Sequence, residues 1–344
     1  MTIKTAILGY GRSGSTLHAD PIEYLPDYDL TAVCDIDPKA LEKASKRFGC
    51  RLYEDYKLML KEEKDLELVI IVTRSEQHCH MVCDCLRAGK NVLITKPWAL
   101  NSDEAMMMIT ASKESRKLLL PWLPARFAND LTRAKEIIDT GVIGKVFQVR
   151  RGEYSFGLRN DWQTMKKYGG GYLLNWGPHL VDQPLQLIGK PIKSVYGELK
   201  QINNPGDVED VFYAVIKTED NVTVITEWNI TTDLLPNWVI QGNRGTVYIT
   251  ANKIEIHKVN LPDCIGEKDY RAAIQVVKTT EELDEKNLIG MHTRYGDPLL
   301  IYPVIAQAIR GEIEYPISLE SALGLTNVLD AIRKSSETGQ VVMF

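Results

Sequence analysis

The first third of the chain alternates short apolar runs with longer segments in which apolar residues recur every three or four positions. The runs are rich in β-branched residues, as buried strands are, and the longer segments end on Gly or on Lys and Arg, as helices often do. Strands are predicted at residues 5–8, 30–35, 66–73, 91–95 and 117–122, and helices at 38–49, 76–89 and 102–116. This alternation predicts an α/β domain built on a doubly wound parallel sheet.

A different pattern begins after Asn129. One helical segment leads into a rapid succession of alternating apolar and polar residues, joined by turn signals such as NPGD and GNRG. A helix is predicted at 130–141, strands at 146–154, 194–202, 208–218, 221–230, 238–242, 245–250 and 253–259, and two further helices at 297–311 and 318–339. We therefore predict a C-terminal α+β domain with a large, mostly antiparallel open sheet, and domains at residues 1–122 and 123–344.

Composition and charge narrow the class of protein. With 344 residues, 44% hydrophobic and 25% charged, the sequence has the balance of a globular protein of two domains. The formal net charge is −5 with scattered Lys and Arg, so we expect no nucleic-acid partner. The absence of a signal peptide and of an apolar stretch of about 20 residues favours a cytoplasmic protein without a membrane partner. All six cysteines except Cys264 lie before residue 90, which favours free thiols in a reducing compartment.

A glycine-rich turn follows the first predicted strand and gives the first chemical signal. The sequence GYGRSG, called the fingerprint below, places Gly9, Gly11 and Gly14 where a tight turn, a close approach to a pyrophosphate and a helix N-terminus are needed. Arg12 and Ser13 lie between the second and third glycines. Asp35 ends the second strand about 20 residues later, where a carboxylate accepts from a ribose 2′-hydroxyl. Because a carboxylate repels a 2′-phosphate, this pattern predicts NAD as the cofactor and makes NADP the weaker alternative.

Two other runs invite functional interpretations that the spacing does not favour. In HCHMVCDC, Cys79 and Cys83 lie one helical turn apart but Cys85 points the other way, and no second ligand pair follows, so we predict no metal site. The three consecutive methionines at 106–108 are more typical of gap filling in a core than of a substrate groove.

Two motifs then carry a family resemblance. The segments AGKNVLITKPWAL (88–100) and GGGYLLNWGPHLVDQ (169–183), together with the fingerprint, resemble the glucose–fructose oxidoreductase/inositol dehydrogenase family, Gfo/Idh/MocA. The resemblance implies an N-terminal Rossmann domain and an NAD(P)-dependent reaction on a hydroxyl of a small carbohydrate or polyol. It also implies that the open sheet of the second domain forms a homo-oligomer, as a dimer, a tetramer or larger.

The sequence departs from the family pattern at two positions. The usual Glu-Lys-Pro is Thr95-Lys96-Pro97, and the usual Asp-x-Gly-x-His has Asn175 in place of its acid while keeping His179. We predict His179 as general base in oxidation and acid in reduction, with Lys96 stabilising oxyanion charge on the reacting hydroxyl. Asn175 would orient the imidazole without charge, and Lys96 itself as the base stays open as the alternative. Asp182 is expected to be a structural partner, although it could reach the imidazole from the next turn.

The resemblance also extends the sets of candidate contacts. Besides the fingerprint, cofactor contacts are expected from Thr73, Arg74, His78, Thr95 and Lys96. Substrate contacts are expected from Trp98, Arg126, Tyr154, Trp162, Tyr172 and Trp176, with Arg159, Asn160, His292, Arg294 and Tyr295 as further candidates.

These features predict an NAD-dependent oxidoreductase that moves a hydride between nicotinamide and a secondary hydroxyl of a sugar, glycoside or cyclitol. The motif combination also resembles family members that oxidise C3 of glucosides. Two alternatives stay open. One is glycoside cleavage through transient NAD-dependent oxidation followed by elimination. The other is a non-catalytic NAD-binding sensor or partner protein, which the loss of two acids suggests.

Overall fold

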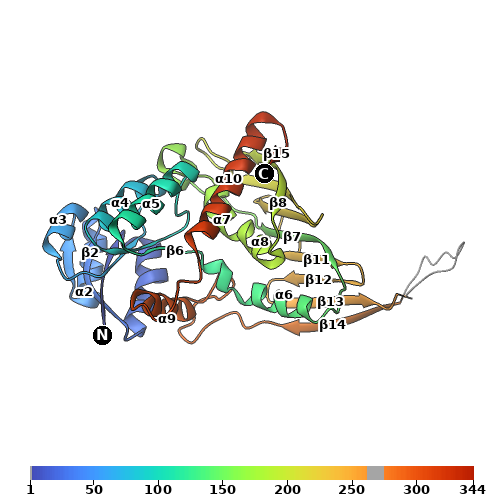
Figure 1. The fold of residues 1–344 in the computed structure, drawn as a ribbon, viewed down its shortest axis with the longest axis horizontal. Helices are drawn as coiled ribbons and strands as arrows, with labels where there is room; N and C mark the ends of the chain where they lie inside the picture. The colour runs from blue at the N-terminus through green and yellow to red at the C-terminus, as the bar shows by residue number, and fades with distance from the viewer. Residues whose placement is uncertain (1, 262–274) are drawn as a thin grey trace, which may run out of the picture. The chain divides into compact units, whose positions relative to one another are not determined.

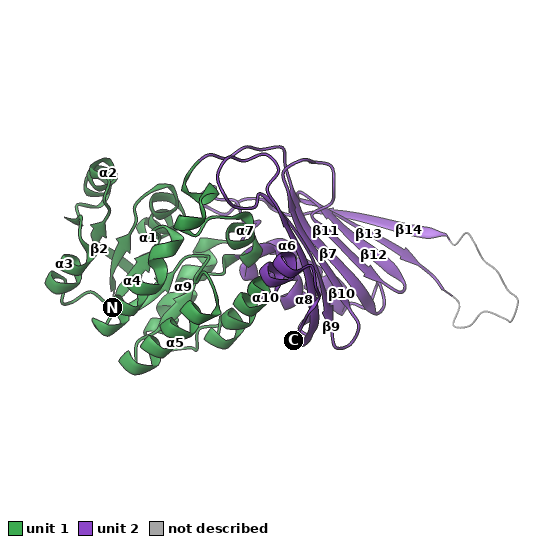
Figure 2. Cartoon of the chain, turned by 90° about the horizontal axis from the view of Figure 1, so that it is seen from above, with its two compact units in different colours: residues 1–124, 161–178, 297–330 green, residues 125–160, 179–296, 331–344 purple. Residues whose placement is uncertain are grey.

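The computed structural model describes residues 2–261 and 275–344, and it divides into two compact units (Figure 2). Unit 1 comprises the chain up to Pro124 with Asp161–Pro178 and Asp297–Asp330, and unit 2 comprises Ala125–Asn160, His179–Gly296 and Ala331–Phe344. The chain thus passes between the units several times, which the single expected boundary after residue 122 does not describe. The two returning segments could not be assigned from sequence because their helical patterns do not reveal which sheet they cover.

Unit 1 is built on a six-stranded parallel sheet (Figure 1). Its strands are β1 (Ile3–Leu8), β2 (Tyr28–Cys34), β3 (Arg51–Tyr53), β4 (Leu68–Ile71), β5 (Asn91–Ile94) and β6 (Leu119–Pro121). All residues of β4 are fully buried, as expected of a strand with helices over both faces of its sheet. The strand order β3-β2-β1-β4-β5-β6 reverses between β1 and β4, and open α/β sheets bind ligands at the carboxyl ends of the strands at such a reversal. The predicted doubly wound sheet is confirmed.

The helices of unit 1 begin and end at residues with clear local reasons. They are α1 (Ala19–Tyr24), α2 (Pro38–Phe48), α3 (Tyr56–Glu62), α4 (His78–Arg87), α5 (Ser102–Ser115), α9 (Pro298–Ile309) and most of α7 (Tyr172–Leu180). Asp37, Asp55 and Asn101 cap α2, α3 and α5 by accepting from backbone amides, and Gly49 ends α2 with a positive φ of 63°. The prediction missed α1, β3 and α3 because they are short and have little apolar periodicity.

Unit 2 contains a nine-stranded sheet in which β7 and β10 are the parallel pair and the other pairs are antiparallel. Its strands are β7 (Val146–Tyr154), β8 (Ile192–Lys200), β9 (Val211–Thr218), β10 (Thr223–Asn229), β11 (Trp238–Gly242), β12 (Gly245–Thr250), β13 (Lys253–Val259), β14 (Val276–Glu282) and β15 (Val342–Met343). Burial alternates along β9 and β10, so one face of the sheet packs on the core. This architecture confirms the predicted α+β domain. The prediction missed β14, whose side chains are nearly all exposed, and the two-residue β15.

Unit 2 contains the helices α6 (Asn129–Asp139) and α8 (Asp182–Ile188), the end of α7 and the last part of α10 (Leu319–Thr338). Helix α8 packs on β7 and α6, and Figure 2 shows α6 and α8 on the same face of the sheet. Ser335 Oγ of α10 accepts from Gly197 N at 3.0 Å, and Ser336 Oγ accepts from Leu199 N at 2.9 Å. These bonds attach the end of α10 to β8.

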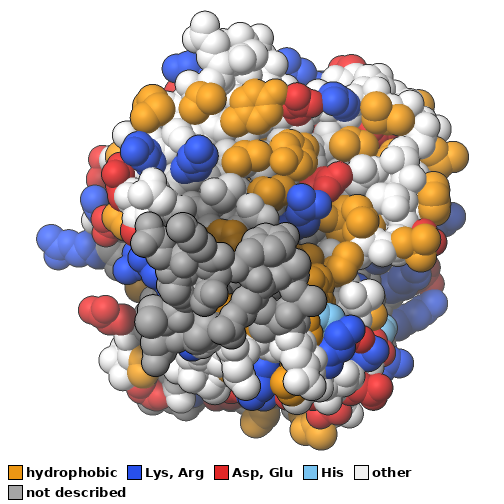
Figure 3. Space-filling model, turned by 90° about the vertical axis from the view of Figure 1, so that its right-hand side faces the viewer, with side chains coloured by type: hydrophobic (Ala, Val, Ile, Leu, Met, Phe, Trp, Pro, Cys, Tyr) orange, Lys and Arg blue, Asp and Glu red, His pale blue; other side chains and the backbone are white. Residues whose placement is uncertain are grey.

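Charged and apolar side chains are mixed on the one face of the surface that Figure 3 draws. On the face drawn in Figure 3, Lys and Arg side chains are dispersed among acidic and apolar ones. Within residues 2–261 and 275–344, no helix has the length and apolar character needed to cross a membrane. Cys34, Cys50, Cys79, Cys83 and Cys85 are free and buried, and Cys264 lies outside the described residues.

A buried hydrogen bond explains why part of α10 belongs to unit 1, and it can be tested. Trp98 Nε1 donates to Thr326 Oγ1 at 2.9 Å, and both side chains are buried. Thr326→Val keeps the side-chain volume but leaves the indole N–H without its acceptor, so the free energy of unfolding should fall by about 1–3 kcal/mol. Urea denaturation measures the change. Thr326→Ser, which keeps the hydroxyl, is the matched control, and a Val variant no less stable than the Ser variant contradicts this role.

Candidate active site

The glycine-rich turn after β1 meets separate steric demands at each glycine. Gly9 has a φ of +91°, and a Cβ there would lie 2.7 Å from Val72 O. A Cβ on Gly14 would lie 2.0 Å from Gly9 O, whereas a Cβ on Gly11 would meet no atom within 4 Å. Gly9 and Gly14 therefore allow the turn to form, while Gly11 leaves the backbone open to an approaching group.

A helical run starts directly after this turn. Ser15 N donates to Gly11 O at 2.9 Å, and the run continues through a π-helical segment, Gly14–His18, into α1. The Arg12 side chain is exposed and Ser13 is half-buried. The first amides of such a run have no acceptor within the helix, which is the arrangement that binds a pyrophosphate.

Asp35 lies immediately after β2, and both of its carboxylate oxygens accept from backbone amides. Oδ2 accepts from Tyr10 N of the glycine turn at 2.6 Å, and Oδ1 accepts from Asp37 N at 2.9 Å. These bonds fix the carboxylate next to the turn and leave it half-buried. The structure therefore brings Asp35 to the fingerprint, as the sequence predicted.

His78 has a different place from the one expected. Its Nδ1 lies 2.8 Å from Pro97 O and its Nε2 lies 3.1 Å from Thr73 O, and burial lowers the pKa of the imidazole below its usual value. The ring thus connects the loop after β4 to the segment after β5. We expected a cofactor contact from this side chain, but its polar atoms position the two loops that carry Thr73 and Lys96.

Lys96 lies two residues after the end of β5, and Asn175 of α7 accepts two hydrogen bonds from it. Its Nζ donates to Asn175 Oδ1 at 2.7 Å and to Asn175 O at 2.8 Å, and it lies 5.8 Å from the Trp176 ring centroid. The two oxygens are neutral, so Asn175 orients the ammonium without neutralising it. The carboxamide oxygen that we expected to accept from His179 accepts from Lys96 in the structure.

Gln163 completes this arrangement, and the sequence analysis missed it. Asn175 Nδ2 donates to Gln163 Oε1 at 3.2 Å, which directs the carboxamide oxygen toward Lys96. Gly171 N donates to Gln163 O at 2.9 Å, and a Cβ on Gly170 would lie 2.4 Å from the same oxygen. The three consecutive glycines at 169–171 therefore let this loop fold closely over the start of α7, and they are the signal that could have indicated Gln163.

Other predicted residues of unit 1 divide between core and surface. Trp98 is 3% exposed and bonded to Thr326, so it serves the core of its unit rather than offering an aromatic face to substrate. Tyr172 is also buried, at the start of α7, whereas Trp162 is half-buried in a short 3₁₀ turn. Arg74 is exposed, and its guanidinium stacks 4.3 Å from the Tyr168 ring centroid. Thr95 is half-buried beside Lys96, and its backbone N donates to Ile71 O at 3.1 Å.

In unit 2, His179 is 4% exposed and packs against Tyr295, with ring centroids 5.3 Å apart. Asp182, on the next turn of the chain, accepts from both Arg126 Nε and Arg126 Nη2 at 2.8 Å. Both side chains of this ion pair are buried. Asp182 is thus a structural partner, as expected. Arg126, which we expected to bind substrate, instead directs its guanidinium at a buried carboxylate of its own unit.

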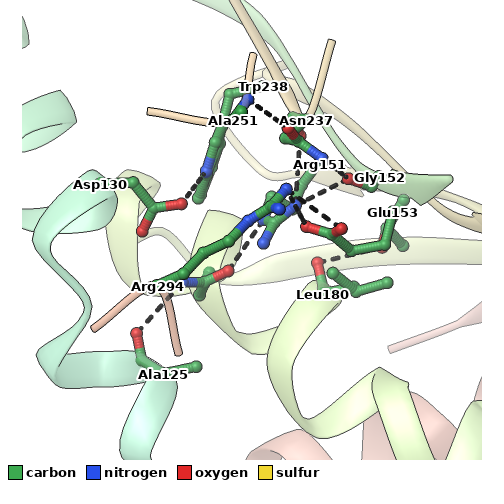
Figure 4. Close-up of polar contacts among 12 residues, drawn as sticks. Ala125, Asp130, Arg151, Gly152, Glu153, Leu180, Asn237, Trp238, Ala251 and Arg294 are labelled. Atoms are coloured by element: carbon green, nitrogen blue, oxygen red, sulfur yellow. Dashed lines mark hydrogen bonds and ion pairs between the residues drawn. The ribbon is translucent and has the colours of Figure 1, made fainter. Parts of the chain in front are cut away.

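The end of β7 carries a buried ionic cluster that the sequence analysis did not identify (Figure 4). Arg151 is fully buried, and its Nη1 donates to Glu153 Oε1 at 2.8 Å. Arg294 Nη2 donates to both oxygens of Glu153, at 2.8 and 3.1 Å. The charged residues of RRGE, at the end of a predicted strand, were the signal in the sequence. They did not reveal the cluster because a buried charged residue on a strand looks the same in sequence as an exposed one.

Tyr154 follows this cluster at the end of β7. Its hydroxyl is buried and has no hydrogen-bond partner among the described residues, and burial raises the pKa of the phenol to about 12. In the next loop, Arg159 N donates to Asn204 Oδ1 at 2.8 Å, while the Asn160 and His292 side chains are exposed.

Comparison with known proteins decides the family. The model described as "Oxidoreductase family, NAD-binding Rossmann fold" matches residues 3–121, and the one described as "GFO/IDH/MocA C-terminal domain" matches residues 131–248. The chain belongs to the Gfo/Idh/MocA family. Unit 1 therefore contains an NAD-binding Rossmann domain, and the chain is an oxidoreductase of the Gfo/Idh/MocA family.

Individual relatives of this Gfo/Idh/MocA protein are distant but match over most of its length. Scyllo-inositol 2-dehydrogenase (NADP(+)) IolW of Bacillus subtilis is 23% identical over 99% of this chain and 96% of its own. An uncharacterised oxidoreductase of Schizosaccharomyces pombe is 30% identical over 71% of this chain and 69% of its own. The crystal structure of an NAD-binding protein from Listeria innocua has a TM-score of 0.83 at 25% identity and covers 100% of this chain and 97% of its own.

The residues of unit 1 fit a dinucleotide. The open space at Gly11, the helix start behind it and the fixed carboxylate of Asp35 match the pyrophosphate and ribose of such a cofactor. The fit rests on the fingerprint and on Asp35.

Two alanine substitutions separate fold from cofactor binding in this Gfo/Idh/MocA chain. Gly11→Ala adds a Cβ in open space, so stability should change by less than about 0.5 kcal/mol, while affinity for the dinucleotide should fall at least tenfold because the methyl occupies the approach to the pyrophosphate. Gly14→Ala should instead lower the melting temperature, because its Cβ collides with the turn. Thermal unfolding and calorimetric NAD titration measure the two effects, and normal affinity in the Gly11 variant excludes the assigned pyrophosphate position.

Proposed function

We propose that the protein is an NAD-dependent dehydrogenase that acts on a secondary hydroxyl of a sugar, glycoside or cyclitol. The observation that carries the proposal is the Lys96 ammonium, held by two neutral oxygens of Asn175 just past the carboxyl end of β5. The carboxyl ends of the strands form the edge at which open α/β sheets bind ligands. A fixed positive charge at that edge suits a reaction in which negative charge develops on an alcohol oxygen.

The chemistry divides between the cofactor and the side chains. Bound NAD supplies the hydride acceptor. Lys96 donates a hydrogen bond to the reacting hydroxyl and stabilises the oxyanion as its proton leaves. His179 takes that proton in oxidation and returns it in reduction, because an imidazole exchanges protons near neutral pH.

The neutral carboxamide at position 175 changes the charge beside the Lys96 ammonium. A carboxylate there would pair with the ammonium, and its charge would oppose the positive charge available to the alkoxide. Asn175 keeps the two hydrogen bonds, and Gln163 keeps the amide in the orientation that makes them. Asn175 thus holds Lys96 through hydrogen bonds without adding a negative charge of its own beside the ammonium.

The substrate class rests on chemistry and on similarity. One relative that matches over 99% of the chain, at 23% identity, is named scyllo-inositol 2-dehydrogenase (NADP(+)), and scyllo-inositol is a cyclitol. Trp176 lies beside Lys96, and an aromatic face suits the apolar side of a sugar or cyclitol ring. The buried hydroxyl of Tyr154 is a further candidate to bond a substrate hydroxyl.

A substrate panel tests this function. Purified protein with NAD is mixed with inositols, sugars and glucosides, and reduced nicotinamide is followed by absorbance. Exchange between paired oxidised and reduced sugars is followed in parallel, because it detects a cofactor that is recycled in place. We expect turnover of at least one cyclic polyol or glycoside. Release of aglycone without reduced nicotinamide identifies the elimination reaction instead, and NAD binding without any turnover identifies a sensor.

Two substitutions assign the catalytic roles. Lys96→Met should abolish turnover, and His179→Ala should lower kcat by about 10²–10⁴-fold and remove the acid limb of the pH profile, because the base is lost. Lys113→Met, on the exposed face of α5, is the matched control and should leave kcat unchanged. Near-normal turnover with a normal pH profile in the His179 variant would show that Lys96 itself takes the proton.

Asp35 gives a test of cofactor choice. Asp35→Ser removes a negative charge beside the site of the ribose 2′-oxygen, so the preference for NAD over NADP should fall about ten- to a hundredfold. Asp37→Ser is the matched control, since Asp37 Oδ1 accepts from Lys39 N as the cap of α2. Because Ser caps a helix about as well as Asp, that variant should keep both its stability and the preference. Titration of both dinucleotides measures the ratio, and an unchanged ratio in the Asp35 variant rules out its role.

A further inference from the structure

A buried hydrogen bond joins the end of the π-helical segment, Gly14–His18, to α9. His18 is fully buried, and its Nδ1 lies 2.8 Å from the hydroxyl oxygen of Tyr302. Tyr302 is also fully buried, and the Trp122 ring packs against both rings, at centroid distances of 5.0 and 5.5 Å. Burial lowers the pKa of His18 to about 3, so the imidazole is neutral and acts here as a hydrogen-bonding group rather than a charge.

The π-helical segment connects this bond to the fingerprint. Gly14 belongs to both, and Ala19 N donates to Gly14 O five residues back, as in a π-turn. Single π-turns are rare and occur frequently at functional sites. This one begins at Gly14, where Gly9 O leaves no space for a side chain, and it ends at the buried His18. Both ends of the turn are therefore fixed, one by the fingerprint itself and the other by the core.

Helix α9 gives this contact a firm support. Tyr28, the first residue of β2, donates from its hydroxyl to Tyr302 O at 2.5 Å. Arg310 Nη2 donates to Asp27 Oδ1 at 2.6 Å, and α9 packs against α1. All of these groups belong to unit 1. A helix that lies 284 residues further along the chain than His18 thus holds the run that follows the fingerprint.

We propose that Tyr302 is a positioning residue of the dinucleotide site. Through His18 it keeps the π-helical segment in the position in which the first amides of the helical run bind the pyrophosphate. Amides bind an anion well only when their N–H bonds point at it, so a small movement of this turn lowers the affinity. The proposal concerns the binding of NAD, and it does not depend on which hydroxyl the enzyme oxidises.

Two tyrosine substitutions that each remove one buried hydroxyl test the proposal. Tyr302→Phe removes the partner of His18, whereas Tyr28→Phe removes the donor to Tyr302 O and leaves the His18 bond intact. Both variants should lower the melting temperature of the cofactor-free protein by about 2–4 °C. Only Tyr302→Phe should raise the Kd for NAD, by about five- to fiftyfold in a calorimetric titration.

Hydrogen exchange and a second variant show whether the effect passes through His18. In the cofactor-free protein, the backbone amides of residues 14–19 should exchange at least about fivefold faster in Tyr302→Phe and at the native rate in Tyr28→Phe. His18→Phe keeps an aromatic ring beside Trp122 but lacks Nδ1, so it should weaken NAD binding as much as Tyr302→Phe does. The double variant should bind NAD no more weakly than either single variant, because both remove the same bond.

The outcomes separate a positioning role from general stabilisation. A native Kd in Tyr302→Phe overturns the proposal, and so does an equal loss of affinity in the two tyrosine variants, which would assign the effect to a loosened unit 1. Losses that add in the double variant also overturn it, because Tyr302 would then act by a route other than His18. If the unsubstituted protein binds no NAD, the proposal fails together with the cofactor assignment. The expected losses in a protein that turns over no polyol would refute the proposed function and leave this role established.

Discussion

The candidate chemistry depends on the pair of hydrogen bonds that Asn175 accepts from Lys96. A lysine at the end of a buried strand has a flexible stem of four carbons, and its ammonium is useful only where something fixes it. Two oxygens of one residue, at 2.7 and 2.8 Å, provide that restraint. The surrounding segments support this contact. Strand β5 ends two residues before Lys96, and the three glycines at 169–171 let the 161–171 loop fold closely over the start of α7. Gln163 orients the Asn175 amide.

Thr95 and Asn175 stand where the family pattern has acids, and the charged side chains described in each unit have fixed partners. In unit 1, Asp35 is fixed by amides of the glycine turn. In unit 2, two sets of charges are compensated by ion pairs, Arg126 with Asp182 and Arg151 and Arg294 with Glu153. Removing one partner from such a set leaves an uncompensated buried charge, so these pairs constrain conformation strongly even where their net contribution to stability is small. His179 adjoins this set through Tyr295.

Sequence patterns predicted the architecture well because it follows from periodicity. The apolar runs of β1, β4 and β5 and the alternation along β9 and β10 each identify a strand, and the glycine spacing identified the tight turn after β1. The partners of polar side chains were not predictable in the same way. Trp98 and Arg126 look like binding residues by type, yet one donates to Thr326 and the other to Asp182, over long sequence separations. Gln163, Arg151 and Glu153 were missed because their role depends on tertiary contacts that no local pattern encodes.

The most direct test of the central claim is a double-mutant cycle between Lys96 and Asn175, measured as the free energy of unfolding in urea. The cycle uses Lys96→Met, Asn175→Leu and the double variant. Asn175→Leu removes the carboxamide oxygen but keeps the backbone oxygen, so the cycle reports the side-chain bond. If that oxygen holds the ammonium, the coupling energy should be about 1 kcal/mol, because either single variant breaks this bond. Single effects that add to the double effect within about 0.5 kcal/mol would contradict the claim.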